Sequence, residues 1–125
     1  MTIVVFASCN NNTNSITKQT VAVLASQQEG LNRNLSHIHY SKHAKCRMGC
    51  RHIDETEVKN MIETGTINYQ KSDLQKDDCN KRYAVEGYSK SQQHLRIIVV
   101  PCANDVTIVT CIDIGEHWKC DCPGD

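Results

Sequence analysis

The segment IDETEVKNMIETG, residues 53–65, carries the signals that start and stop an α-helix. Asp54 and Glu57 have the spacing of a capping box, in which two side chains accept free backbone N–H groups of the first turn. Gly65 supplies the left-handed residue that often ends a helix. The apolar positions between these signals have i, i+3, i+4 spacing and would face a core: Val58, Met61 and Ile62. We therefore expect a helix between Asp54 and Gly65 with one buried face.

Further elements are predicted on both sides of this helix. Before it, His37–Tyr40 is a candidate short strand, and Ser41 is a candidate N-cap for a helix that runs to Cys50. After it, the apolar period changes to two, which predicts four strands: Thr66–Gln70, Arg82–Tyr88, Leu95–Val100 and Val106–Ile114. The last two strands are joined by a turn at residues 103–105. This order predicts an α+β fold: a short strand, two helices and then a four-stranded antiparallel meander.

The composition limits the class of protein. With 125 residues, the chain has room for one domain. Its 14 Lys and Arg balance its 14 Asp and Glu, so the electrostatic argument for a dedicated nucleic-acid binder is missing and we expect no DNA partner. Hydrophobic residues make up 39% of the chain and the mean hydropathy is -0.48. These values suit a modest core and leave no membrane-spanning run.

The first nine residues end in Ala7-Ser8-Cys9, and an uncharged polar stretch follows at once. This arrangement resembles the end of a bacterial lipoprotein signal, in which Cys9 becomes the lipidated first residue of the mature protein. The resemblance implies a location in the cell envelope, in the periplasm or at the outer membrane. The lipid would then be the only contact with a membrane.

The same resemblance sets the expected organisation of the chain. Residues 1–9 would be the end of a truncated signal, 10–35 a polar linker, 36–122 the folded domain and 123–125 a tail. The charged n-region of a signal is missing. The alternative is that Met1 is the true start, with a short strand at 3–7 in a cytoplasmic protein.

Eight cysteines distinguish this chain from an ordinary small domain. If Cys9 is lipidated, seven remain, and an odd number cannot all pair within one molecule. Cys46 and Cys50 are four residues apart on the first predicted helix. Their Cβ atoms would be about 5–6 Å apart, which is too far for a mutual disulfide that needs about 3.5–4.5 Å.

Cys120 and Cys122 follow the last predicted strand and can meet Cys46 and Cys50. The four sulfur atoms then form either a tetrahedral zinc site or two disulfides between the same helix and the same tail. A reducing cytosol favours zinc, whereas an oxidising envelope favours disulfides. His43 and His117 are additional candidate ligands or neighbours of a metal.

The remaining cysteines and two histidines carry further predictions. Cys79 and Cys102 are the next candidate pair, and Cys111 is expected to be a small buried hydrophobic residue with an inert thiol. His37 and His39 alternate on a strand and face one side. With His43 nearby they could form a histidine-rich metal patch, although a pair of surface histidines is the more common arrangement.

The segment HAKCRMGCR, residues 43–51, with the helix after it and two hydrophobic strands, resembles the family called domain of unknown function 4258. The likeness covers roughly Tyr40 to Ile114. Cys46, Cys50 and the terminal WKCDC, residues 118–122, resemble a Bacteroidetes-type envelope branch of that family. The layout is similar to RelE-type ribonuclease toxins, and the family name brings no characterised activity.

Three cationic side chains of this helix lie on one stripe. His43, Arg47 and Arg51 fall within about 80° of each other at 100° per residue. Such a stripe could hold a phosphate and supply a general acid or base, as a RelE-like ribonuclease acting on RNA requires. The structural alternative is that the two arginines pair with carboxylates and hold the helix to the sheet, the candidates being Glu57, Glu86 and Asp113.

These observations favour a small envelope-tethered domain with a structural four-cysteine site, acting as a binding or interaction module rather than as an enzyme. Its partner would be a protein or a small molecule. The alternative function is the RelE-like ribonuclease or a toxin-derived domain that uses His43, Arg47 and Arg51.

Overall fold

A computed structural model describes residues 30–123, which divide between two compact units, Met1–Leu31 and Asn32–Asp125. All features below belong to the second unit. Lipidation at Cys9, the alternative strand at 3–7 and most of the polar linker lie outside the described residues. In order, the elements are β1 (His37–Tyr40), α2 (Lys42–Cys50), α3 (Glu55–Thr64), β2 (Thr66–Ile67), the 3-10 turn η1 (Tyr69–Lys71), β3 (Tyr83–Tyr88), β4 (His94–Cys102) and β5 (Asp105–Asp113). Within 30–123, no helix is long and apolar enough to cross a bilayer.

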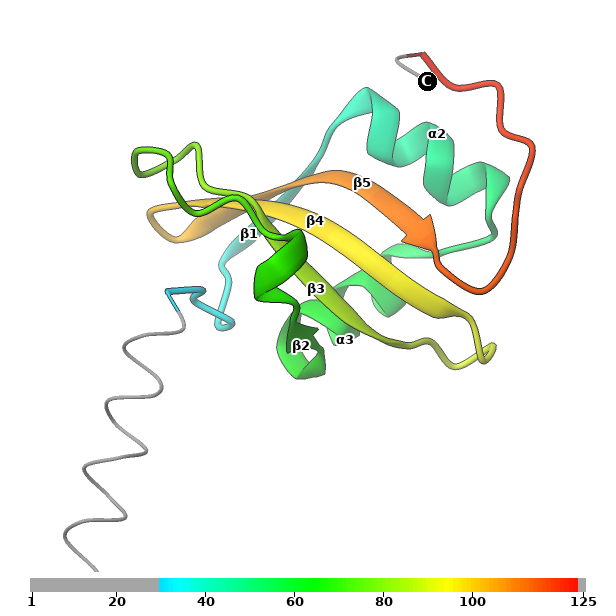
Figure 1. Ribbon diagram of the computed structural model, residues 1–125, viewed down its shortest axis with the longest axis horizontal. Helices are drawn as coiled ribbons and strands as arrows, with labels where there is room; N and C mark the ends of the chain where they lie inside the picture. Colours follow the sequence, from blue (N-terminus) through cyan, green and yellow to red (C-terminus); the bar gives the residue numbers. More distant parts are fainter. Residues whose placement is uncertain (1–29, 124–125) are drawn as a thin grey trace, which may run out of the picture. The chain divides into compact units, whose positions relative to one another are not determined.

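The strands form one mixed sheet, and the α+β class is confirmed (Figure 1). Strands β2 to β5 are antiparallel neighbours, as expected for a meander. The strand count and order differ from the prediction, because β1 also joins the sheet and gives five strands in the order β1-β5-β4-β3-β2. β1 pairs with β5 in parallel. Parallel neighbours need a long crossover connection, and α2 and α3 begin that crossover.

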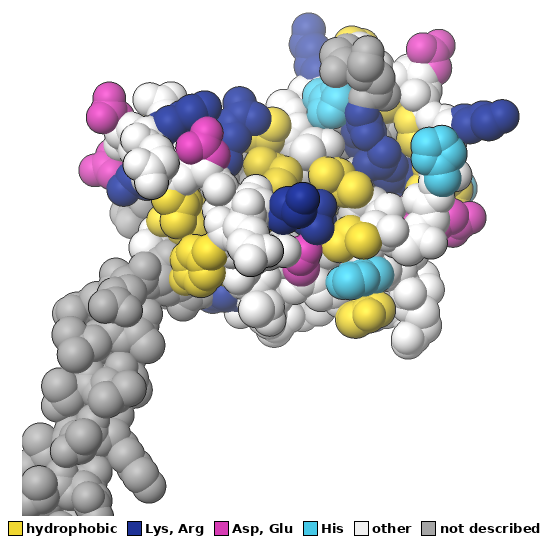
Figure 2. Space-filling view, viewed as in Figure 1, with side chains coloured by type: hydrophobic (Ala, Val, Ile, Leu, Met, Phe, Trp, Pro, Cys, Tyr) yellow, Lys and Arg dark blue, Asp and Glu magenta, His cyan; other side chains and the backbone are white. Residues whose placement is uncertain are grey.

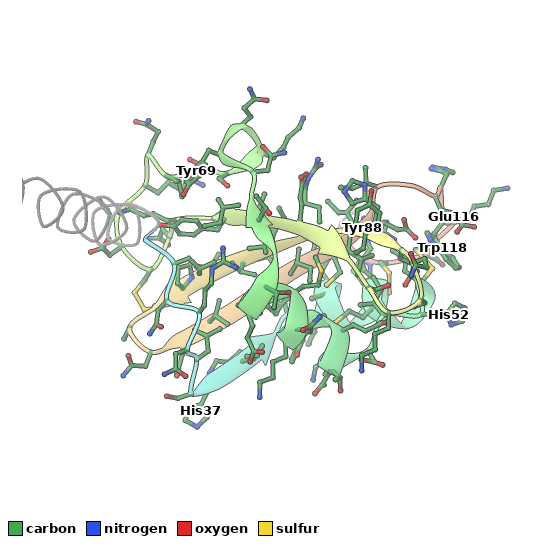
Figure 3. The ribbon with its side chains drawn as sticks, turned by 90° about the horizontal axis from the view of Figure 1, so that it is seen from below. His37, His52, Tyr69, Tyr88, Glu116 and Trp118 are labelled. Atoms are coloured by element: carbon green, nitrogen blue, oxygen red, sulfur yellow. A yellow bond between two sulfur atoms is a disulfide. The ribbon has the colours of Figure 1, made fainter. Side chains whose placement is uncertain are left out.

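Only one face of the sheet is fully buried. Along β4, Leu95, Ile97 and Val99 are buried, whereas the side chains between them are partly exposed. α2 contacts β5 and α3 contacts β3 on the buried face (Figures 1 and 3). The helices contribute these buried apolar side chains: Ala44, Met48, Val58, Met61 and Ile62.

An irregularity in β5 changes which of its side chains face the helices. Ile98 pairs with Thr110, but its neighbour Val99 pairs with Ile108, so one residue of β5 is left over. An extra residue of this kind shifts the alternation by one position. Val106 and Ile108 are therefore buried before the bulge, and Cys111 and Asp113 after it.

The predicted helix starts are confirmed. Ser41 caps α2 by accepting a hydrogen bond from the backbone N–H of Ala44, and Asp54 and Glu57 form the capping box of α3. The predicted left-handed stop at Gly65 is wrong, because Gly65 is extended with φ -69°. Glycine is needed there for space: an added Cβ would lie 2.5 Å from the Met61 carbonyl oxygen.

β2 is shorter than the predicted strand at 66–70. Asn68 ends it, because the Asn68 side chain accepts hydrogen bonds from the backbone N–H groups of Gln70 and Lys71. This local bonding turns the chain into η1 in place of a longer strand.

Candidate functional site

Two disulfides join α2 to the C-terminal segment, residues 115–123. Cys46 bonds Cys122 and Cys50 bonds Cys120, with Cα–Cα distances of 5.8 and 5.9 Å. Four residues of a helix advance about 6.0 Å, and two residues of extended chain advance about 6.5 Å. Because these spacings match, a segment running antiparallel to α2 can form both bonds at once.

The four cysteines therefore meet as the sequence predicts, and the disulfide alternative is the one found. The zinc alternative is not supported, because every one of these sulfur atoms is already bonded to another. Among residues 30–123, no group of three or more His, Cys, Asp or Glu could hold a metal ion. His43 lies beside the disulfides, with its ring Nδ1 2.8 Å from the Pro123 carbonyl oxygen, and His117 is exposed.

The start of the C-terminal segment is held by Asp113. The Trp118 indole N–H donates to the Asp113 carboxylate at 3.0 Å, and the Gly115 backbone N–H donates to its other oxygen at 3.1 Å. The Trp118 ring meets the ring of His52 edge-on, with 5.5 Å between centroids. Figure 3 shows Trp118 and His52 at the same end of the molecule.

Arg51 holds α2 to the edge of β5. This arginine is buried, with 8% of its surface exposed, and its Nη1 donates to the Cys111 carbonyl oxygen. Burial, and then the charge of Arg47, lower the pKa of Arg51. Further along the same edge, Ser41 donates its N–H to the Ile108 carbonyl and its hydroxyl to the Val109 carbonyl.

The ion pairs expected between Arg51 and nearby carboxylates are not formed. Within residues 30–123, none of Glu57, Glu86 and Asp113 forms an ion pair with Arg51. Glu57 accepts from the Asp54 N–H and the Ser91 hydroxyl, and Glu86 accepts from Asn68 and Arg96. Arg51 thus joins helix to sheet through a carbonyl oxygen, and its buried guanidinium is not presented to a phosphate. This placement favours the structural role.

The other predicted sites have the following positions. Cys79 and Cys102 form a third disulfide, as predicted, and Cys111 is a buried free cysteine. Burial raises the pKa of the Cys111 thiol to about 12, which keeps it protonated at neutral pH. His37 and His39 each approach Asp105, at 3.3 and 3.4 Å, while His43 contacts Pro123 instead.

One structural residue was missed because it lies in the segment predicted as linker. The Arg33 guanidinium donates to the carbonyl oxygens of Ile62 and Gly65, at 3.0 and 2.6 Å. These groups lie at the C-terminus of α3, where a helix leaves carbonyls without internal partners and favours positive charge. The contact spans about 30 residues of sequence, so no local signal indicates it.

A mixed sheet with helices on one face and, within residues 30–123, three disulfides defines a small disulfide-rich α+β domain. The model of the family described as Domain of unknown function (DUF4258) matches residues 40–113. The chain belongs to this family. Comparison with curated proteins and with solved structures gave no match.

Proposed function

We propose that this domain is a disulfide-stabilised binding module of the cell envelope, tethered through a lipid on Cys9. The observation that carries the proposal is that almost all the described cysteines form disulfides. Of the seven in residues 30–123, six are paired and the seventh is buried. Disulfides persist in oxidising compartments such as the bacterial periplasm and are rare in the cytosol.

The face of the sheet opposite the helices is the proposed binding surface, and we call it the open face. Tyr88 on β3 is 66% exposed, and Ile114 after β5 is 39% exposed. Both residues lie beside His94 at one end of this face. Three partly buried apolar side chains continue the face along β4 and β5: Ile98, Val100 and Ile112. Figure 2 shows hydrophobic side chains gathered over this part of the molecule, with basic (Lys or Arg) and His side chains among them.

Hydrogen bonds and ring stacking hold the polar side chains of the open face in place. Arg96 donates from Nε and Nη2 to one oxygen of Glu86, at 3.1 and 2.9 Å. The Tyr88 ring stacks on His94 with 4.5 Å between centroids. Interfaces between proteins are enriched in aromatic residues and arginine on such rigid, partly apolar surfaces. A protein partner therefore suits the open face best.

The oxidation of the cysteines to disulfides and the lipidation of Cys9 can be tested together. In the Cys9→Ser chain, alkylation of denatured, unreduced protein should modify one thiol, that of Cys111. After reduction it should modify seven. Metabolic labelling with palmitate should mark the wild-type chain expressed behind its native upstream sequence and leave Cys9→Ser unlabelled. Seven free thiols without reductant, or no labelling at all, would contradict the proposal.

The binding surface is tested by photo-crosslinking in cells. A photoreactive residue at position 88 should give a discrete adduct that is lost when Ile114→Asp is added, because the charge disrupts the apolar contact. The matched control places the photoreactive residue at position 60 instead. Asn60 is an exposed residue of α3, which covers the opposite face of the sheet. Equal adducts from both positions would argue against the open face.

A further inference from the structure

The three disulfides have different environments. Cys122 is buried, and Cys46, Cys50 and Cys120 are half-buried between α2 and the C-terminal segment. Cys79, in the loop before β3, and Cys102, at the end of β4, are in contrast both exposed. A thiol must reach a sulfur atom to react with it, so exposure separates Cys79–Cys102 from the other two.

Cys79 is one of the residues that line a charged pocket of about 380 Å³. Lys76, Asp77 and Arg82 are among the residues that line it. Lys76 pairs with Asp73 at 3.2 Å, whereas the Arg82 guanidinium has no ion-pair partner within residues 30–123. Arg82 is therefore the lining cation whose charge is available to stabilise a thiolate on Cys79, and the negative charge of Asp77 acts against that thiolate. Nearby cations stabilise a thiolate relative to its thiol.

The backbone on both sides of this disulfide is in an unfavourable conformation. Cys79 has φ 71° and Ala103, next to Cys102, has φ 55°. Left-handed backbone at residues other than glycine is uncommon and costs free energy. Cys79 is itself part of the disulfide, so opening the bond allows its backbone to relax, whereas Ala103 lies in the turn between β4 and β5.

We propose that Cys79–Cys102 is a thiol–disulfide exchange site that reacts with small thiols while the domain stays folded. The thiolate of a small thiol attacks Sγ of Cys102 from solvent. A new S–S bond forms there, the Cys79–Cys102 bond breaks, and its electron pair leaves on Sγ of Cys79, in the pocket that Arg82 also lines. A second thiolate attacks the small-molecule sulfur of this mixed disulfide and releases Cys102 as a thiolate. Two thiols are thereby oxidised to one disulfide, and the two electrons reduce the protein.

Backbone hydrogen bonds hold the segments around Cys79 and Cys102 independently of their disulfide. The loop between η1 and β3 is also held by the paired backbone groups of Asp73 and Arg82, at 2.8 and 2.9 Å. The β4–β5 ladder runs through Cys102 and Asp105 without help from the disulfide. Both α2 disulfides lie elsewhere and remain closed.

The test uses 2-mercaptoethanol, a neutral thiol, with acid quenching, alkylation and peptide mapping of the native protein. We expect Cys79–Cys102 to open at least about tenfold faster than either α2 disulfide, with the first adduct on Cys102. Far-ultraviolet circular dichroism and the emission of Trp118 should stay native. Earlier opening of an α2 disulfide, a first adduct on Cys79, or loss of native signal together with reduction would overturn the proposal.

Charge variants test the role assigned to Arg82. Arg82→Gln should slow the first step about fivefold, and Asp77→Asn should accelerate it, because each changes the stability of the leaving thiolate. The matched control is Lys90→Gln, which removes the same charge in the turn at the opposite end of β4. Equal slowing by Arg82→Gln and Lys90→Gln would show that Arg82 does not stabilise the leaving group.

Discussion

The Nη1 atom of Arg51 donates a hydrogen bond to the carbonyl oxygen of Cys111, and this contact lies on the outer edge of β5. β1 covers that edge only as far as Ile108, which pairs with Tyr40. Beyond that point α2 supplies the donors through Ser41 and Arg51. An edge strand with free carbonyls invites pairing with other chains, so the helix that carries the family resemblance also closes the sheet.

Replacing Arg51 should destabilise the fold. We expect Arg51→Met to lower the free energy of unfolding by about 2–3 kcal/mol, because it leaves the buried Cys111 carbonyl without its donor. Urea denaturation measures the change. Lys45→Met, at an exposed position of α2, should change stability by less than about 0.5 kcal/mol. A stable Arg51→Met that loses an RNA-cleaving activity of the wild type would instead support the ribonuclease alternative.

The two α2 disulfides should be strongly coupled. Each alone closes a loop of 70 or 76 residues, but once one is formed the other closes only a few residues. Removing either pair with Cys→Ser changes should therefore cost about 2 kcal/mol, and removing both about 6 kcal/mol, by loop-closure entropy. Chemical denaturation of the three variants measures these costs.

The third disulfide provides the comparison for this coupling. Cys79 and Cys102 are 23 residues apart, and their loop is independent of the other two. The double variant Cys79→Ser/Cys102→Ser should cost about 3 kcal/mol in either background. Strictly additive costs for the two α2 disulfides would show that they do not constrain the same loop.

The Glu86–Arg96 pair should contribute to stability above the pH at which Glu86 is protonated. Burial acts to raise the pKa of Glu86, but hydrogen bonds from Asn68 and Arg96, and the charge of Arg96, lower it overall from the ordinary value of 4.5. A lowered folded-state pKa gives stability that is complete above 4.5 and lost as the pH falls through the folded value.

Glu86→Gln should accordingly lower stability by about 1 kcal/mol at neutral pH, since both side chains are largely shielded from solvent. The difference from wild type should shrink below pH 4.5 and disappear once the pH has fallen through the lowered folded-state pKa of Glu86. Urea denaturation across the pH range measures it. Glu63→Gln, at an exposed position of α3, should show no such trend, and a Glu86→Gln difference that persists in acid would contradict the assignment.

Cys111 should be unreactive in the folded protein. Its side chain is fully buried and burial raises the pKa of its thiol to about 12, so the reactive thiolate is scarce at neutral pH. Iodoacetamide at pH 8 should modify Cys111 only in denaturant, as mass spectrometry will show. Rapid alkylation of the native protein would mean that the face of β5 beneath α2 opens readily.

Trp118 is the single tryptophan and reports on the C-terminal segment. Asp113→Ala removes the acceptor of its indole N–H and should cost about 1–2 kcal/mol. We expect the emission of Trp118 to shift to longer wavelength while both α2 disulfides remain closed. Unchanged emission would show that the disulfides alone position the ring.

Local features of the fold could be predicted because their causes lie within a few residues. The capping box of Asp54 and Glu57, the N-cap Ser41 and the antiparallel order of the last strands all follow from near neighbours. The sequence predicts a helix end at Gly65, but from a left-handed conformation that this residue does not adopt. The crowding that requires glycine comes from the Met61 carbonyl in the last turn of α3 and also from Val85, which is 20 residues away in sequence.

The meeting of four cysteines was also predictable, since their spacings match on a helix and an extended tail, but their pairing was not. Sequence spacing alone permits either a metal or disulfides, and the antiparallel path of the C-terminal segment decides which sulfur meets which. The ion pairs considered for Arg51 were not formed, because the bulge in β5 and the uncovered edge place a backbone carbonyl within its reach.

Periodicity, capping and motif spacing act over short distances along the chain. The amino-acid sequence alone therefore predicts the two helices, the antiparallel strands after them, the family and the four cysteines able to meet. Packing between distant segments places β1 in parallel beside β5 and Arg51 at the edge of β5, and it leaves one of the disulfides in residues 30–123 exposed to solvent. Each of these depends on which distant segments pack together, and that is set by the burial of the whole core.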